Sequence, residues 1–124
     1  MQIIEKAREI VEFIKKHDNV HIVTHLDADG ICAGAIAVKT LERLGKDFDI
    51  SFVKQVDEVS IEDVLNKNPD VIWFTDLSIN IDIDFDNIVV TDHHSTVKHY
   101  RYSLNPNDFG LDGCVGLSLS LIHI

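Results

Sequence analysis

The segment VHIVTHLDADG, residues 20–30, joins a run of β-branched apolar residues to a histidine and two aspartates. Val, Ile and Thr favour extended chain, so the apolar part predicts a strand over 19–25. The sequence DADG then predicts a turn, and residues 31–45 have the helical spacing of small and apolar residues, closed by Gly45. The segment therefore predicts a buried strand that leads, through a polar turn, into a helix.

The same change from apolar to polar residues occurs at two more predicted strands. Residues 70–78, DVIWFTDLS, and residues 87–95, NIVVTDHHS, each run from apolar residues into acids or histidines. Runs that are apolar on both faces are typical of strands buried on both sides in a parallel sheet. We also predict helices over 2–16 and 60–68, the second with Ser60 as its N-cap, and strands over 48–55 and 102–107. This alternation predicts an α/β fold with a mainly parallel, Rossmann-like sheet of about five strands flanked by helices.

Composition limits the class of protein. The chain has 124 residues, of which 45% are hydrophobic and 26% charged, as expected of one folded domain or part of one. No apolar run approaches the ~18–20 residues of a membrane span, and the N-terminus lacks the pattern of a signal peptide. The two cysteines, Cys32 and Cys114, fit no zinc-site spacing. We therefore expect a cytoplasmic protein that does not contact a membrane.

The formal net charge of −10 argues against a basic nucleic-acid-binding surface on this segment. It does not exclude a nucleic-acid substrate, because bound divalent cations would invert the local field.

The polar clusters are expected to meet at one edge of the sheet. Ligands of open α/β sheets bind beyond the carboxyl ends of the strands, and in a parallel sheet these ends lie on the same edge. Four carboxylates held together with no basic partner would repel one another, so a divalent cation is the economical compensation. The convergent set consists of His25, Asp27, Asp29, Asp76, Asp92, His93 and His94.

Seven candidate groups exceed the needs of one ion, so we expect two ions that share a carboxylate. Two-metal sites with ions ~3.5–4 Å apart are the usual apparatus for phosphoester hydrolysis. Each aspartate taken alone is more simply a turn former or a helix cap, and each histidine an exposed side chain. The same placement at three strand ends favours a site. His17, His21 and His99 lie outside the clusters and are interpreted as structural or surface groups.

The three clusters resemble the motifs of the DHH phosphoesterase superfamily. HLDADG matches the first motif, TDLS the second and TDHHS the third. This superfamily includes RecJ-type single-strand exonucleases, oligoribonucleases, cyclic-dinucleotide phosphodiesterases and family II inorganic pyrophosphatases. HLDADGICAGAIA and NPNDFGLDG are most similar to RecJ-like nucleases of archaeal type.

The resemblance implies a role for each matching position. It implies that His25 and Asp27 bind one Mn²⁺, that Asp29 and His93 bind a second, and that Asp76 bridges the two, with Mg²⁺ as an alternative metal. It implies that Asp92 orients a neighbouring ligand, that His94 faces the scissile phosphate and that a metal-bound hydroxide is the nucleophile. Asn105 and Asn107 are expected to line the substrate path.

The chain also departs from the family pattern. The fourth motif, an Asp that completes the second metal site, and the C-terminal substrate-binding domain find no match within residues 1–124. We therefore expect residues 1–118 to be the N-terminal part of a DHH domain, which by itself is nearly inactive. Residues 119–124, LSLIHI, match what a common transposase adapter encodes in this frame, so we expect a non-native tail. A genuine apolar strand or helix start is the alternative.

Taken with the motifs, the resemblance implies a Mn²⁺-dependent phosphodiester hydrolase, acting as an exonuclease on single-stranded DNA or RNA. One alternative is a small-molecule phosphoesterase for cyclic dinucleotides, oligoribonucleotides or pyrophosphate. Another is a catalytically silent DHH domain that serves as a scaffold in a replication or repair complex. The expected partners are accordingly a single-stranded nucleic acid or nucleotide substrate and proteins of replication or repair.

Overall fold

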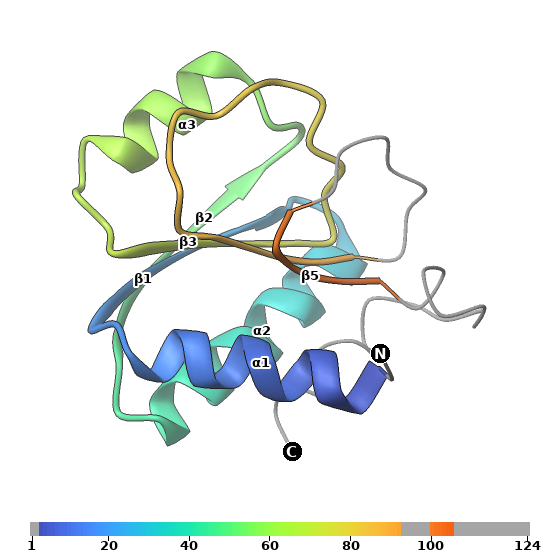
Figure 1. Cartoon of the computed structure of the whole chain (residues 1–124). Helices are drawn as coiled ribbons and strands as arrows, with labels where there is room; N and C mark the ends of the chain where they lie inside the picture. Colours follow the sequence, from blue (N-terminus) through green and yellow to red (C-terminus); the bar gives the residue numbers. More distant parts are fainter. Residues whose placement is uncertain (1–2, 93–99, 106–124) are drawn as a thin grey trace.

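The computed structural model describes residues 3–92 and 100–105 (Figure 1). Five strands form one sheet in the order β2-β1-β3-β4-β5, and every neighbouring pair is parallel. The α/β fold with a parallel sheet is therefore confirmed. In chain order the elements are α1 (Ile3–Lys15), β1 (Asn19–His25), α2 (Ala28–Arg43), β2 (Asp47–Val53), α3 (Glu58–Leu65), β3 (Val71–Thr75), β4 (Ile88–Thr91) and β5 (Tyr102–Leu104).

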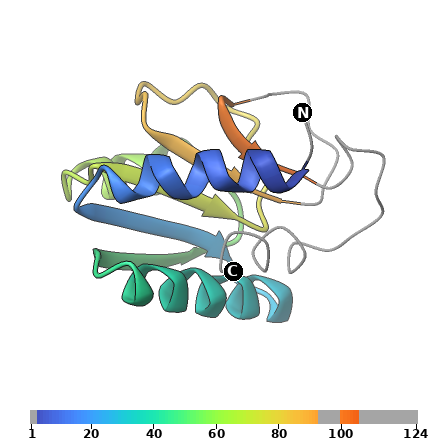
Figure 2. The ribbon, with the colours of Figure 1, turned by 60° about the horizontal axis from the view of Figure 1, so that its bottom comes forward.

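Helices cover both faces of the sheet, as Figures 1 and 2 show: α1 and α2 lie on one face and α3 on the other. The core under α1 and α2 contains Ile10, Leu41 and Trp73, all fully buried. The core under α3 contains Phe74 and Ile72. Burial on both sides explains why β3 is apolar at successive positions. Among the described residues, no helix combines the length and hydropathy that crossing a membrane requires.

The predicted start of α2 was wrong. The helix begins at Ala28, because the Asp27 side chain accepts a hydrogen bond from the Gly30 backbone N–H at 2.8 Å and caps the helix. The sequence DADG is therefore a cap and first helical turn. At the other end, the N–H of Lys46 donates to the carbonyl of Leu41 at 3.0 Å, and Gly45 has a φ of 68°. This geometry closes the helix at the glycine, as predicted.

The predicted N-cap of α3 was also wrong. Asp57 caps the helix, with its carboxylate accepting from the Ser60 N–H at 2.8 Å. Its own N–H donates to the Ser60 hydroxyl at 3.1 Å. Ser60 is thus the third residue of the helix, and its hydroxyl completes a capping box with Asp57.

His21 is a buried histidine in β1, which places it among the structural groups. It is 1% exposed, and its Nε2 lies 2.7 Å from the Ser51 hydroxyl oxygen. Its Nδ1 has no hydrogen-bond partner in the part of the chain that the structure describes. Burial lowers the pKa of the His21 imidazole below its usual 6.5, and the charge of Lys67 lowers it further against the opposing effect of Asp49.

This burial predicts a loss of stability in mild acid. Because the folded-state pKa of His21 is lowered, the unfolded chain binds a proton below about pH 6.5 before the folded chain does. The free energy of unfolding should therefore fall between about pH 7.5 and about pH 5.5, and fall less in His21→Gln. Urea unfolding at both pH values measures this. An equal pH dependence of unfolding in His21→Gln and the parent would contradict the prediction.

Candidate metal centre

The junction between β1 and α2 holds His25 and Asp27 in place. A Cβ built on Gly30 would lie 1.9 Å from the His25 carbonyl oxygen, so only glycine permits the first turn of α2 to approach the end of β1 this closely. The Thr24 hydroxyl donates to the Gly30 carbonyl at 2.7 Å and ties the two elements together. His25 ends the strand and Asp27 caps the helix, so both are positioned by secondary structure.

Asp76 reaches the same edge of the sheet from β3. It follows the last residue of the strand, is 3% exposed and has a φ of 57°. This left-handed conformation is one that Asp and Asn adopt more readily than most residues. The Asp76 backbone N–H donates to the Thr91 carbonyl of β4 at 3.1 Å. Because β3 pairs with β1 on one side and β4 on the other, Asp76 lies between the ends of those two strands.

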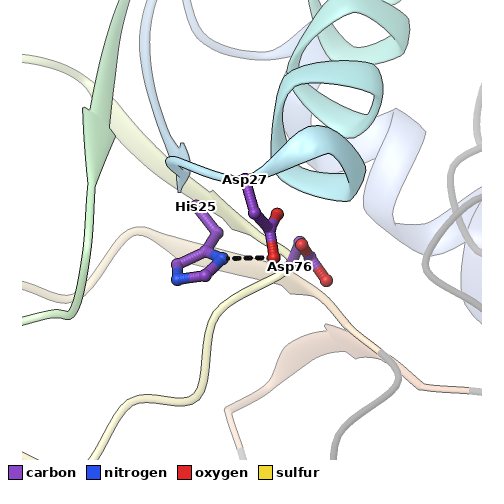
Figure 3. Close-up of side chains that lie close together, drawn as sticks. All are labelled: His25, Asp27 and Asp76. Carbon is purple, nitrogen blue, oxygen red and sulfur yellow. Dashed lines mark ion pairs between the residues drawn. The ribbon is translucent and has the colours of Figure 1, made fainter.

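These three side chains form one group (Figure 3). One possible ligand atom from each of His25, Asp27 and Asp76 lies within 4.8 Å of the others. The Nδ1 atom of His25 is 2.8 Å from the Asp27 carboxylate oxygen. The Gly30 N–H lowers the pKa of Asp27 most, and the His25 imidazole lowers it further, while desolvation opposes both. These contacts thus favour the ionised form of the Asp27 carboxylate, which is the form that can bind a cation.

The donor set fits a divalent transition metal. One imidazole and two carboxylates are ligands that Mn²⁺, Fe²⁺ and Zn²⁺ accept, whereas Ca²⁺ prefers oxygen alone. Two ligand atoms that are each about 2.1 Å from an ion are at most about 4.2 Å apart, and neighbouring ligands are closer than that. The three atoms of the group, within 4.8 Å of one another, would therefore have to draw together to bind one ion. A divalent cation would also offset the two neighbouring carboxylate charges.

The other predicted site residues are placed differently. Asp29 lies in the first turn of α2, where its side chain is exposed. It does not belong to the group of His25, Asp27 and Asp76, which we call the metal-binding group. Asp92 directly follows β4 and Asn105 directly follows β5, and they are 3% and 5% exposed. His93, His94 and Asn107 lie outside the described residues. The roles of all these residues as ligands, catalytic groups or substrate contacts stay predictions.

The sequence reasoning missed two residues that position the group. Thr24 and Gly30 connect β1 to α2 but ligate nothing themselves. The signal for Gly30 is present in the sequence, since a glycine next to a polar cluster often marks a close approach of backbone. The interpretation of DADG as a turn hides that signal.

A separate groove lies between α1 and the β5 end of the sheet. It has a volume of about 460 Å³ and is lined by α1 and β5, including Arg8, Phe13, Arg101 and Tyr102. Three glutamates of α1 also line it, and the Phe13 ring stacks on Tyr102 with centroids 3.9 Å apart. None of its lining residues belongs to the metal-binding group, so the groove is not the candidate centre.

Comparison with known sequences gives one partial match. No family model matches the sequence. An uncharacterised protein of Methanocaldococcus jannaschii is 28% identical over 126 residues, covering 89% of this chain and 29% of that protein. The chain therefore spans less than a third of the length of this curated relative.

Two solved structures are similar to nearly the whole chain. One is exonuclease RecJ bound to manganese, with a TM-score of 0.68, 20% identity and coverage of 99% of this chain and 37% of that one. The other is RecJ from Thermus thermophilus in complex with Mn²⁺, with a TM-score of 0.70, 20% identity and coverage of 98% and 20%. At this identity the likeness establishes the fold alone: the chain has the fold of these RecJ structures, as its three motifs led us to expect.

Proposed function

We propose that the protein is a metal-dependent phosphodiester hydrolase, a RecJ-like exonuclease that acts on single-stranded nucleic acid with Mn²⁺. The observation that carries this proposal is the group of His25, Asp27 and Asp76 at the carboxyl edge of the sheet. Support comes from the two RecJ structures of the same fold, both of which contain manganese. The three intact motifs support it as well.

In this proposal the chain's own residues hold and orient the metal. His25 and Asp27 bind from the β1–α2 junction, and the tight contact at Gly30 limits their movement. Asp76 binds from β3, with its backbone fixed by the hydrogen bond to Thr91. A divalent cation held by these residues would supply a Lewis acid that polarises a phosphodiester and activates water.

The proposal includes a second ion that shares Asp76 with the first. Asp76 lies between the ends of β1 and β4, so its carboxylate is placed to bind one ion on the β1 side and another on the β4 side. On the β4 side, Asp92 is 3% exposed and its N–H donates to the Leu104 carbonyl at 3.1 Å. A buried carboxylate in this position suits a group that orients a neighbouring ligand.

The test is an exonuclease assay on the complete product of the gene. End-labelled single-stranded DNA and RNA oligonucleotides are incubated with Mn²⁺, with and without EDTA. We expect progressive shortening that EDTA abolishes and that is slower on duplexes. Hydrolysis of cyclic dinucleotides or pyrophosphate with no shortening of oligonucleotides would favour the small-molecule alternative. Metal binding with no hydrolysis of any of these substrates would favour the scaffold alternative.

A further inference from the structure

The groove between α1 and β5 contains basic side chains that lack an acidic partner. Its volume is about 460 Å³. Arg8 and Lys16 line the groove from the side of α1, and Arg101 lines it from the position just before β5. None of the three forms an ion pair with another described residue. The groove thus offers three positive charges to a ligand.

Three glutamates of α1 line the same groove, and two of them already have basic partners. Glu9 lies 3.4 Å from the Lys6 ammonium group, and Glu12 lies 3.3 Å from that of Lys15. Glu5 is the third, and it has no ion pair in the described part of the chain. With these two lysines included, the groove and its rim carry five basic and three acidic side chains. The groove is therefore positive in a chain whose formal net charge is −10.

Contacts between α1 and β5 hold the two walls of the groove together, as their positions side by side in Figures 1 and 2 indicate. The Lys6 ammonium group donates to the Arg101 backbone carbonyl. The Phe13 ring stacks on Tyr102 with centroids 3.9 Å apart, and the Arg101 guanidinium lies 5.3 Å from the centroid of Tyr102. Since these contacts occupy the Tyr102 ring, little of it is left to stack on a base. A ligand of this groove would be held by its charge.

The cations are spread along the groove. Arg8 and Lys16 are eight positions apart on or just after α1, which corresponds to about 12 Å along a helix axis. One phosphate cannot reach both cations, whereas a chain of anionic groups can. Lys16 and Arg101 lie near the amino ends of β1 and β5, and the metal-binding group lies at the opposite, carboxyl edge of the parallel sheet. The helix runs antiparallel to β1 (Figure 2), so Arg8 lies nearer the carboxyl edge than Lys16.

We propose that this groove binds the sugar–phosphate backbone of single-stranded nucleic acid, at nucleotides remote from the scissile phosphate. Arg8, Lys16 and Arg101 pair with phosphates of one strand, and a guanidinium can hold a phosphate through two parallel hydrogen bonds. Positively charged grooves that follow the backbone are typical of single-strand binding without sequence preference. The proposal rests on the proposed function, which supplies a polyanionic substrate, and it adds a second contact site away from the metal-binding group.

The test compares a long strand with a strand too short to reach the groove. The complete gene product is titrated, with Mn²⁺, against fluorescent phosphorothioate oligonucleotides of about 16 and about 3 nucleotides, which resist hydrolysis. The triple variant Arg8→Gln, Lys16→Gln, Arg101→Gln should bind the long strand about 10- to 100-fold more weakly and the short strand equally well. Its slope of log affinity against log salt on the long strand should fall by about 2. An abasic long strand should show the same loss.

Three further variants separate charge from other effects. Glu5→Gln removes the unpaired acid and should strengthen binding of the long strand by about 2- to 5-fold. The double variant Arg8→Lys, Arg101→Lys keeps both charges and should keep the parental salt slope. Lys67→Gln removes an exposed lysine that follows α3, on the other face of the sheet, and should change neither affinity.

Parental affinity and salt slope in the triple variant would overturn the proposal, and they are the results expected if the groove binds an acidic protein segment instead. An equal loss on the long and the short strand would overturn it as well, as would failure of the parent to bind the long strand. Hydrolysis of bis-p-nitrophenyl phosphate, which is too small to reach the groove from the metal-binding group, tests the proposed function separately.

Discussion

Asp76→Asn should abolish hydrolysis and reduce Mn²⁺ affinity more than any other single change in the metal-binding group. The change removes the negative charge of a buried carboxylate, the proposed bridging ligand, which lies between the ends of β1 and β4. Loss of residues that merely support metal ligands costs about 10- to 100-fold in affinity, so loss of this ligand should exceed that range. Because Asn also adopts the left-handed conformation, the φ of 57° at this position should be kept and the fold with it.

Calorimetric titration with Mn²⁺ measures the number of sites and their affinity. Asp76→Asn should weaken every site, whereas His25→Ala should mainly empty one of two. Asp84→Asn, at an exposed aspartate in the same loop, makes the same change of charge and should leave binding unaltered. Two sites of parental affinity in Asp76→Asn would refute the bridging role.

Gly30→Ala should be among the most destabilising substitutions in the described part of the chain. A methyl group here would lie 1.9 Å from the His25 carbonyl oxygen, a contact that neither backbone can relieve without moving. Alanine is favoured over glycine within a helix by only about 1 kcal/mol, whereas forced overpacking costs about 1–3 kcal/mol and at times more. Contact with a rigid backbone atom places this case at the upper end, with a net loss of about 3 kcal/mol or more.

The same substitution should also impair metal binding, because it separates the two elements that carry His25 and Asp27. Urea unfolding and Mn²⁺ titration of Gly30→Ala measure the two effects. Gly45→Ala is the matched control: its Cβ meets no atom within 4 Å, but its φ of 68° disfavours alanine. It should cost about 1–2 kcal/mol and leave Mn²⁺ affinity unchanged. Parental stability with parental Mn²⁺ affinity in Gly30→Ala would show that the junction is looser than the structure has it.

The strands that carry the site could be anticipated because strands leave strong local signals. β1 spans 19–25 as predicted, and the apolar runs of β3 and β4 were found at the right places. The ends of β3 and β4 were predicted too far along the chain. Thr75 is the last residue of β3 because Asp76 turns into the left-handed region, and a φ angle of one residue has no clear signature in the sequence.

The starts of α2 and α3 were missed for a related reason. Asp27 and Asp57 are both turn formers and helix caps in sequence statistics, and the hydrogen bond each makes in the folded chain decides between these roles. For Asp27 the decision depends on the contact between Gly30 and His25, which only the packing of helix on strand creates. Local sequence therefore predicted the existence of each helix better than its first residue.

The candidate site was anticipated as a set of strand ends, and the three residues that the structure groups there were among the predicted ligands. Parallel pairing brings His25, Asp27 and Asp76 to one edge, and this follows from fold class alone. The placement of Asp29 depends on which side of the first turn of α2 it occupies, and there it is exposed. Its role as a ligand of a second ion therefore stays a prediction.

Anomalous diffraction at the manganese edge, from crystals of the protein soaked in Mn²⁺, tests the central claim most directly. We predict an anomalous peak in contact with His25, Asp27 and Asp76, and a second peak that shares Asp76. A manganese peak elsewhere with none among these three side chains would contradict the account, because the proposed hydrolysis depends on a cation at this edge of the sheet.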